Sequence, residues 1–488
     1  MIRRYFNVIL VGLGMLGLLF WTASCAVNPV SGRHEFMLLS EAEEVNLGRE
    51  TDGQVLQEYG IYKEPELTAY LSTLCQRLGK VSHRPNLTYQ FKILDASVVN
   101  AFAVPGGYVY FTRGILATLN NEAELAGVMA HEIGHITARH SAQQYSKAQF
   151  AQVTLGVGAA VADAVGLSGL SGLAQLGVGM LFLRFSRDNE RQADSLGVEY
   201  ASKLNYDASQ LAEFFQTLEQ MNPGSDRSGL PGWFSTHPSP DDRLHAVRAQ
   251  SQQWQQKLAL SNPVINGDAY LRKIDGLIFG EDPRQGYVKD NTFYHPDLRF
   301  QFPVPDRWKL QNTPSQVQMV NEGKDAMILF GMEAGTSSGE VAKKFVTQTK
   351  AQVIRSNAIR VNGLSSQHMV SDIRSDKGVI RVMSYFIEKD KKVFVFHGLT
   401  SPSKFQNVEA LFEKTMGQFK ELSDPNRINV KPDRIHVRST RTADTLENTL
   451  RSLGVPDDQL KQIALLNGRQ LNDRIPASTL VKVVEKGR

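Results

Sequence analysis

The sequence contains little cysteine and little net charge, and each shortage excludes a class of protein. Only two cysteines, Cys25 and Cys75, occur in 488 residues, so a disulfide scaffold is excluded and stability must come from packing. Lys and Arg number 54 against 50 Asp and Glu, and this net charge of +4 gives no electrostatic case for nucleic acid as a partner. Hydrophobic residues make up 42% of the chain, which excludes a disordered protein; the length predicts roughly two to four domains.

Residues 1–25 have the composition of a secretory signal. Arg3 and Arg4 precede an apolar run at 8–20, and small residues then lead to Cys25. The segment resembles a bacterial lipoprotein signal, although Thr22 stands where that pattern prefers Leu. The resemblance implies that Cys25 is lipidated and holds the chain on a membrane, facing the periplasm. It also implies the outer membrane, because no Asp follows the cysteine. An ordinary cleaved signal or an uncleaved anchor is the alternative.

The pentapeptide His131-Glu132-Ile133-Gly134-His135 lies within a helical pattern and has the form His-Glu-x-x-His. Residues four apart share one face of a helix, so both imidazoles can bind one ion, and this spacing is typical of zinc metallopeptidases. Glu132 would lie beside them, close enough to take a proton from a water molecule. Asn121 and Glu124 predict the start of this helix.

A catalytic zinc takes three protein ligands and leaves one position open. Glu190, in the helical-looking segment 186–194, is the candidate for the third ligand. Asp194 follows it by four residues and would share its helix face, where it could accept a hydrogen bond from a ligand imidazole. These residues predict one Zn²⁺ per chain, bound by His131, His135 and Glu190.

Taken together, these segments resemble the M48 family of zinc metallopeptidases, over about residues 40–250. The resemblance implies an α+β, zincin-type domain with an active-site helix, with His131, His135 and Glu190 as ligands and Glu132 as general base. The matching pieces are Asn100–Ala103 with Pro105-Gly106-Gly107, Glu124–His135, Ser186–Asp194, and Thr236-His237-Pro238 with Arg243.

Several further residues are candidates for the reaction. By resemblance and by charge, Arg243 is expected to stabilise the oxyanion, with a structural ion pair as the alternative. His237 could approach the metal and occupy its open position, which would be self-inhibiting, or it could be a hydrogen-bonding loop residue. His140 lies five residues after His135, off the ligand face, so it either supports the site from outside or lies on the surface. The extended stretch Asn100, Ala101, Phe102 and Ala103 could bind substrate as an added strand.

The rest of the chain divides by pattern. Ser40 and Glu43 predict a capping box for a helical region that continues to about residue 78. The peptidase domain is expected at 26–260; its apolar segment 151–185 could cover the active site or dip into a membrane. Residues 285–424 resemble a small α/β sandwich of the PsbP-like type. Residues 433–488 resemble a LysM module, a βααβ fold that binds glycan, although Ala443 replaces its usual glycine.

These observations predict a zinc-dependent endopeptidase of the bacterial cell envelope. The resemblance implies that it cleaves misfolded or misassembled envelope proteins, so its partners would be unfolded polypeptides. One alternative is an outer-membrane assembly or chaperone-like factor in which proteolysis is secondary. Another is a peptidoglycan-associated binding protein in which zinc only holds the fold.

Overall fold

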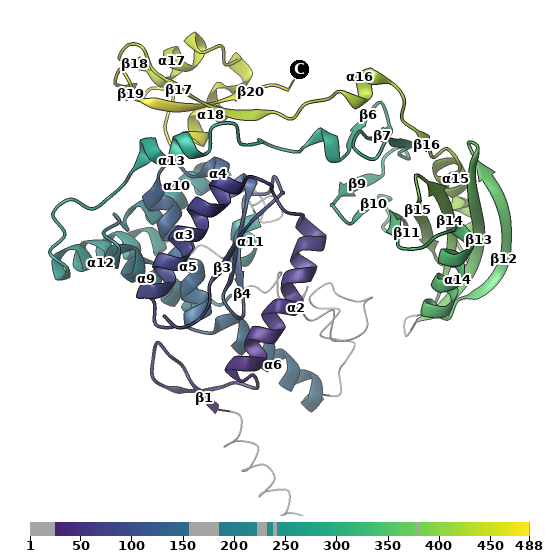
Figure 1. The fold of residues 1–488 in the computed structure, drawn as a ribbon, viewed down its shortest axis with the longest axis horizontal. Coiled ribbons are helices and arrows are strands. Elements are labelled where there is room, and N and C mark those ends of the chain that lie inside the picture. The colour runs from purple at the N-terminus through teal and green to yellow at the C-terminus, as the bar shows by residue number, and fades with distance from the viewer. Residues whose placement is uncertain (1–24, 156–184, 222–231, 238–241, 376–377, 488) are drawn as a thin grey trace, which may run out of the picture. The chain divides into compact units, whose positions relative to one another are not determined.

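The computed structural model describes residues 25–155, 185–221, 232–237, 242–375 and 378–487, and the chain forms two compact units (Figure 1). Unit 1 contains the chain up to Leu56 together with Gly60–Gly280 and Arg434–Glu485, and unit 2 is built mainly from Glu281–Asp433. Each unit combines helices and strands, which confirms the mixed α and β class that the sequence predicts.

Helix α2 (Glu41–Tyr59) begins as predicted and ends earlier than predicted. The Ser40 side chain accepts the Glu43 backbone N–H, and the Glu43 side chain accepts the Ser40 backbone N–H, which forms the capping box. The helical region does not run on to residue 78, because Gly60 takes a φ of 69° and a new helix, α3, starts at Pro65. Proline fits the first turn of a helix, where its missing N–H is not needed.

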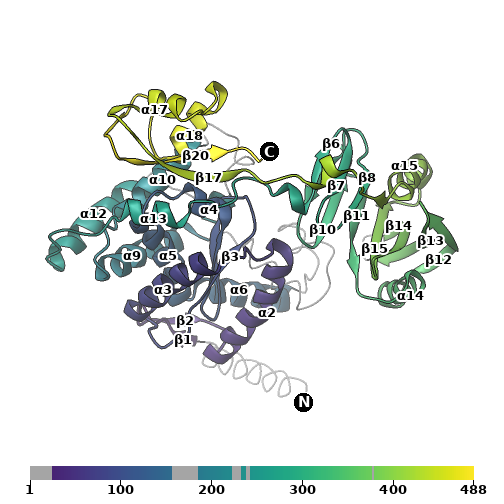
Figure 2. The same ribbon diagram turned by 45° about the horizontal axis from the view of Figure 1, so that its top comes forward.

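A three-stranded sheet and the helices around it form the core of unit 1. Strand β5 lies in the middle, parallel to β3 and antiparallel to β4, so β4 is an edge strand. Every residue of α5 is buried, as expected for a helix surrounded by other elements. Helices α3, α5 and α9 pack together (Figures 1 and 2). The bounds are β1 Cys25–Val27, β2 His34–Phe36, α3 Pro65–Val81, β3 Gln90–Leu94, β4 Ala101–Val104, β5 Tyr108–Thr112, α4 Arg113–Thr118, α5 Glu122–Thr137, α6 His140–Leu155, α9 Arg187–Lys203, α10 Gln210–Met221, α11 Gly232–Thr236, α12 Arg243–Lys257 and α13 Gly267–Lys273.

The C-terminal segment packs into unit 1 instead of standing apart as a separate module. Its outer strands β17 and β20 pair antiparallel, and two short helices lie between them in sequence. Ile435, Leu450 and Val481 belong to the same hydrophobic cluster as the residues of α5. Figures 1 and 2 show the segment beside α10 and α13. The order is strand, helix, helix, strand, but the resemblance to LysM stays a prediction. The bounds are β17 Arg434–Ser439, β18 Asp444–Thr445, α17 Leu446–Ser452, η3 Asp457–Gln459, α18 Leu460–Leu466, β19 Arg474–Ile475 and β20 Leu480–Glu485.

Unit 2 contains a seven-stranded antiparallel sheet in the order β12-β13-β14-β15-β11-β10-β9, and a four-stranded sheet. Alternating residues of β15 face opposite sides: Val393 and Val395 pack with Val341 of α14, whereas Phe394 and Phe396 pack with Phe412 of α15. The two helices therefore cover opposite faces of the large sheet. The bounds are η2 Pro283–Gln285, β6 Tyr287–Lys289, β7 Thr292–His295, β8 Phe300–Pro303, β9 Lys309–Asn312, β10 Gln316–Val320, β11 Ala326–Glu333, α14 Ser338–Thr349, β12 Gln352–Val361, β13 Leu364–Ser375, β14 Gly378–Lys389, β15 Lys392–Thr400, α15 Phe405–Gly417, β16 Lys420–Glu421 and α16 Pro425–Ile428.

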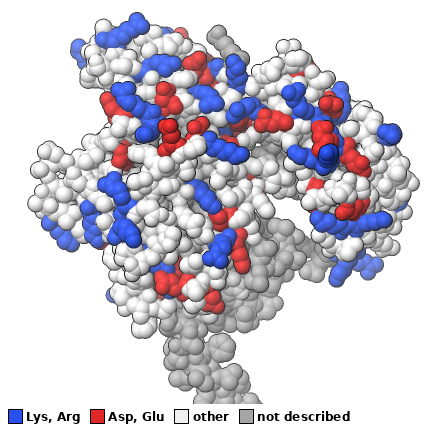
Figure 3. Space-filling model, viewed as in Figure 1, with Lys and Arg blue, Asp and Glu red and all other residues white. Residues whose placement is uncertain are grey.

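The surface of each unit mixes charges of both signs on the face seen in Figure 3. Across the described residues, every helix is too short or too polar for a membrane crossing. Cys25 is the first described residue and lies opposite Phe36 in the β1–β2 pair, and its lipidation stays a prediction. Residues 156–184, most of the apolar segment predicted to cover the site or meet a membrane, lie outside the described residues.

Candidate metal centre

Two glycines allow helix α9 to approach helix α5 closely. A Cβ on Gly197 would lie 3.1 Å from the backbone nitrogen of His131, and a Cβ on Gly134 would lie 3.1 Å from the carbonyl oxygen of Ala193. Larger side chains at these positions would push the helices apart, because interiors are already close-packed. The approach places Glu190, in the first turn of α9, opposite the two histidines of α5.

The three residues predicted to bind zinc are brought together, and all three are buried. The Nε2 atoms of His131 and His135 are 3.1 Å apart. The Glu190 carboxylate places one oxygen 3.7 Å from Nε2 of His131 and the other 3.5 Å from Nε2 of His135. A tetrahedron with zinc–nitrogen bonds of about 2.0–2.1 Å has edges of about 3.3–3.4 Å. The separations and the donor types therefore fit one zinc ion.

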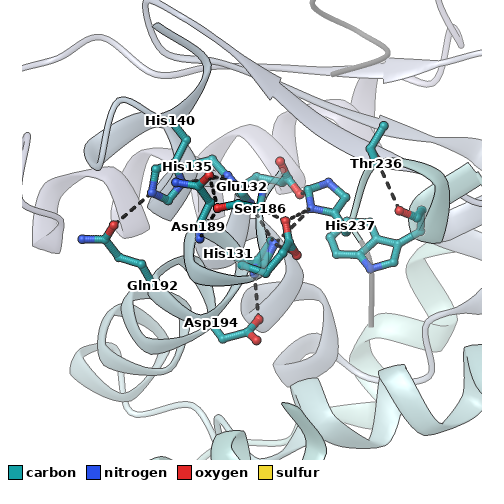
Figure 4. Close-up of polar contacts among 12 residues, drawn as sticks. His131, Glu132, His135, His140, Ser186, Asn189, Gln192, Asp194, Thr236 and His237 are labelled. Atoms are coloured by element: carbon teal, nitrogen blue, oxygen red, sulfur yellow. Dashed lines mark hydrogen bonds and ion pairs between the residues drawn. The ribbon is translucent and has the colours of Figure 1, made fainter. Parts of the chain in front are cut away.

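His237 supplies a fourth donor to this group. Its Nδ1 lies 3.1 Å from a Glu190 oxygen and 3.4 Å from Nε2 of His131, and all four donor atoms lie within 4.8 Å of one another. The Trp233 ring stacks on the His237 imidazole with 4.2 Å between centroids, and the backbone N–H of His237 donates to the Trp233 carbonyl. Of the two alternatives for His237, the structure therefore places it at the metal-binding group (Figure 4).

Asp194 orients the first ligand ring, and Arg243 holds Asp194. The carboxylate accepts a hydrogen bond from Nδ1 of His131 at 3.0 Å, which leaves Nε2 of that ring for the metal (Figure 4). Nε and Nη2 of Arg243 each donate to Asp194 at 2.7 Å, and Nη1 lies 3.1 Å from Glu190. The guanidinium is thus engaged with the two carboxylates. This geometry corresponds to the ion-pair alternative for Arg243 and does not support the oxyanion role.

Burial determines the protonation of the site. Burial lowers the pKa of His131, lowers that of His135 further, and lowers that of His237 to about 3. The imidazoles are therefore neutral near pH 7, the form that binds metal. Burial raises the pKa of Glu190 to about 7. Burial also opposes ionisation of Asp194, but the charge of Arg243 and the hydrogen bond from His131 outweigh it and lower its pKa to about 2.

Glu132 lies beside the metal-binding group. Its side chain is 1% exposed, and one of its oxygens lies 3.5 Å from Nε2 of His237. Among the described residues neither oxygen has a hydrogen-bond partner, which is costly for a buried carboxylate unless a ligand or water completes it. Burial, and then the charge of Glu190, raise the pKa of Glu132 well above its usual value. A carboxylate in this environment is suited to carry a proton.

The predicted substrate-binding stretch lies at the edge of the sheet. Ala101, Phe102 and Ala103 belong to β4, which pairs with β5 on one side, and Asn100 directly precedes it. Within the described residues no strand pairs with the other edge of β4. Asn100 is buried, and its side-chain oxygen has no hydrogen-bond partner there. Binding of substrate by this stretch stays a proposal.

Four further residues lie at the site, and the sequence pattern suggested a role for only one of them. His140 contacts His135, Gln192 contacts His140, the Phe185 ring lies tilted against His135 with 4.0 Å between centroids, and Trp233 stacks on His237. Only His140 carried a signal, as a histidine close to the motif. The other three are ordinary polar or aromatic residues whose importance depends on tertiary contacts.

The sequence of this chain is similar to those of known peptidases over the region that contains the site. Residues 65–251 match the model of Peptidase family M48. The beta-barrel assembly-enhancing proteases of Yersinia pestis and Escherichia coli are each 29% identical over 253 residues, which is 50% of this chain and 50% of theirs. The mitochondrial metalloendopeptidase OMA1 of Schizosaccharomyces pombe is 31% identical over 223 residues, 45% of this chain and 64% of that protein.

The chain spans about half the length of the bacterial relatives it matches. Among solved structures, cyanobacterial PsbP from Synechocystis covers 27% of this chain and 91% of its own, at 14% identity and a TM-score of 0.24. That similarity is too low to support a fold assignment, so the PsbP-like type stays a prediction. The His/Glu cluster of unit 1 could hold the metal of such a peptidase. The family match confirms the M48 resemblance: at residues 65–251 the chain contains a domain of Peptidase family M48.

Proposed function

We propose that this chain is a zinc-dependent endopeptidase of the bacterial cell envelope that hydrolyses misfolded or misassembled envelope proteins. The observation that carries the proposal is the convergence of His131, His135 and Glu190 on one point, with the buried Glu132 carboxylate beside it. Zinc bound there would polarise a peptide carbonyl and make water a nucleophile near neutral pH.

Glu132 is the proposed general base. Its carboxylate takes the proton of the attacking water and passes it to the leaving amine. The raised pKa of Glu132 favours the first transfer, because a more basic carboxylate accepts a proton more readily. Asp194 and Arg243 do not touch the reacting atoms in this scheme: they hold the rings and carboxylates in place.

Strand β4 is the proposed substrate-binding element. An extended peptide could add to its open edge through main-chain hydrogen bonds. Because backbone groups are common to all peptides, such binding gives affinity with little dependence on sequence. This suits a protease that acts on unfolded segments.

His237 is proposed to hold the site in a closed, self-inhibited state. Its Nδ1 lies among the donor atoms, where it would be a fourth ligand to bound zinc in place of a water molecule, and its Nε2 faces Glu132. The side chain must therefore withdraw before a peptide is cleaved. Trp233, which stacks on it, would have to move or release it at the same time.

The cellular site and substrates are inferred from relatives and from the leader. The bacterial relatives are named as beta-barrel assembly-enhancing proteases, which associates them with envelope proteins. A lipidated Cys25 would hold this chain on the periplasmic side, at the outer membrane. We extend both properties to this chain as part of the proposal.

The test uses the purified chain with unfolded casein as substrate. Wild type is expected to cleave casein, to stop when zinc is chelated and to recover when zinc returns. Glu132→Gln should retain bound zinc and lose cleavage, whereas the exposed Glu66→Gln should behave as wild type. Cleavage that survives complete removal of zinc, or undiminished cleavage by Glu132→Gln, would refute the mechanism.

An assembly or chaperone-like role is the second candidate, because the bacterial relatives are named for assembly as well as proteolysis. In cells lacking the chain, Glu132→Gln separates the two: full rescue of the envelope phenotype would favour assembly over proteolysis. Glycan binding by the C-terminal segment must be tested in the whole chain, because that segment shares its core with unit 1.

A further inference from the structure

His140 lies between a metal-binding histidine and a glutamine of α9. Its Nδ1 is 3.0 Å from Nδ1 of His135, and its Nε2 is 3.0 Å from the side-chain oxygen of Gln192 (Figure 4). His140 is 1% exposed, so its two ring nitrogens contact these side chains and not water. Three side chains, Gln192, His140 and His135, thus form a chain that leads from α9 to the donor group.

The backbone brings His140 back to His135. Helix α5 ends at Thr137, and Arg139 takes a left-handed φ of 57°, so that α6 starts in a new direction at His140. This conformation is unfavourable for a residue with a side chain. It is held by a salt bridge of 2.8 Å from Arg139 to the buried Glu44, and by a hydrogen bond from Arg139 to the Leu39 carbonyl.

The partners determine which nitrogen of each ring carries a proton. A neutral imidazole has one N–H and one acceptor nitrogen, and two ring nitrogens 3.0 Å apart need one donor and one acceptor between them. The Gln192 oxygen can only accept, so that N–H is at Nε2 of His140. Nδ1 of His140 is then an acceptor, and Nδ1 of His135 must donate to it. The lone pair of His135 is therefore left on Nε2, which faces the Nε2 atom of His131.

The two ligand rings are thus oriented by different means. Asp194, an ionised carboxylate, orients His131, whereas a neutral imidazole backed by an amide would orient His135. The geometry points to His140 as a positioning residue for His135: it fixes the tautomer and the ring plane in which His135 binds zinc, and Gln192 fixes His140. This inference rests on the zinc site of the proposed function.

A purely packing role for His140 is the competing explanation. The Phe185 centroid lies 4.0 Å from the His135 centroid and 6.2 Å from that of His140, so the three rings also form an aromatic cluster. The two explanations differ in what they require of residue 140. Packing needs a flat, bulky ring, whereas positioning needs a hydrogen-bond acceptor at Nδ1.

The experiment measures zinc affinity by competition with a chromogenic chelator, using the full chain. Loss of an outer hydrogen-bond partner typically costs about 10–100-fold in metal affinity. His140→Phe keeps the bulk and removes the acceptor, so it should bind zinc that much more weakly. His140→Asn is smaller and keeps an acceptor oxygen near Nδ1, so it should stay close to wild type. His245→Phe, at an exposed position of α12, is the matched control.

Two further measurements keep the test independent of folding and of proteolysis. The absorption bands of the Co²⁺-substituted protein should change in His140→Phe and not in His140→Asn, because they report ligand geometry. Gln192→Met, at a half-buried position, should weaken zinc binding in the same direction even if His140→Phe fails to fold.

Wild-type affinity in both His140→Phe and Gln192→Met would overturn the inference, as would His140→Asn weakening zinc binding more than His140→Phe. A wild-type chain that binds zinc but does not cleave casein would refute the proposed protease alone. A wild-type chain that binds no zinc would refute both.

Discussion

Lys482 donates from its Nζ to the carbonyl oxygen of Leu119 at 2.9 Å. The same nitrogen donates to Ala117 at 2.8 Å and to Thr118 at 3.2 Å, and the side chain is buried. These carbonyls end α4, directly before the helix that carries the zinc motif. An ammonium has three N–H donors, so one lysine from the C-terminal segment reaches three carbonyls at a helix end, where a cation is also favoured; the Thr118 carbonyl accepts from the Asn120 side chain as well.

Replacing Lys482 with Met should destabilise unit 1, because it removes the Lys482 donor from the carbonyls of Ala117 and Leu119, whereas Thr118 keeps the Asn120 side chain. Leaving a buried polar group without its partner typically costs about 1–3 kcal/mol. We expect this loss in the free energy of unfolding measured with urea. Lys461→Met, at an exposed position of α18, is the control and should change little. An equal effect of both variants would contradict the role of Lys482.

Replacing Arg243 with Met distinguishes the ion-pair role from the predicted oxyanion role. The variant leaves Asp194 and Glu190 without their shared cation, so the protein should lose roughly 3–5 kcal/mol of stability, and zinc binding should also weaken. Arg248→Met, on the same helix but partly exposed, is the control. Unchanged stability and zinc binding with a large fall in kcat would instead support contact with the oxyanion.

Replacing His237 with Ala should raise the rate of casein cleavage several-fold. The substitution removes the fourth donor and leaves His131, His135 and Glu190, which is the ligand number of an open catalytic site. Zinc content, measured in the same samples, should stay near one per chain. If zinc is retained and cleavage falls, His237 takes part in the reaction and does not inhibit it.

The stability of unit 2 should fall as the pH drops from about 6.5 to about 4. His397 lies 2.8 Å from the Ser384 hydroxyl and stacks with Phe345, and burial lowers its pKa from 6.5 to about 4. In this range the unfolded chain takes up a proton that the folded unit excludes, so folding loses up to about 3 kcal/mol.

His397→Gln should reduce this pH dependence in the calorimetric transition of unit 2 without abolishing it, because burial also lowers the pKa of His295 in the same unit to about 4. His436→Gln, in unit 1, is the control and should leave it unchanged. An equally steep dependence in His397→Gln would show that other groups are responsible.

The zinc ligands could be predicted because each lies in a short local motif, and these motifs follow one another along the chain as they do in the M48 family. His131 and His135 are four residues apart on one helix, and Glu190 and Asp194 repeat that spacing on another. The start of α5 could also be predicted from the sequence: the Asn121 side chain accepts the Glu124 backbone N–H at 2.7 Å.

The rest depends on contacts that no local pattern encodes. Helical spacing placed His140 off the ligand face because it assumed a continuous helix, whereas the left-handed turn at Arg139 ends α5 and folds His140 back. Lys482 occupies the middle of a strand, where alternation predicts a solvated side chain next to buried valines. Residues 481–483 are in fact all buried, because unit 1 covers both faces of β20.

The most direct test of the metal centre is anomalous diffraction at the zinc edge from crystals of the full chain. We expect one peak in unit 1, about 2.0–2.1 Å from Nε2 of His131, from Nε2 of His135 and from a Glu190 oxygen. The absence of a peak in a correctly folded chain, or a peak away from these three side chains, would contradict the account.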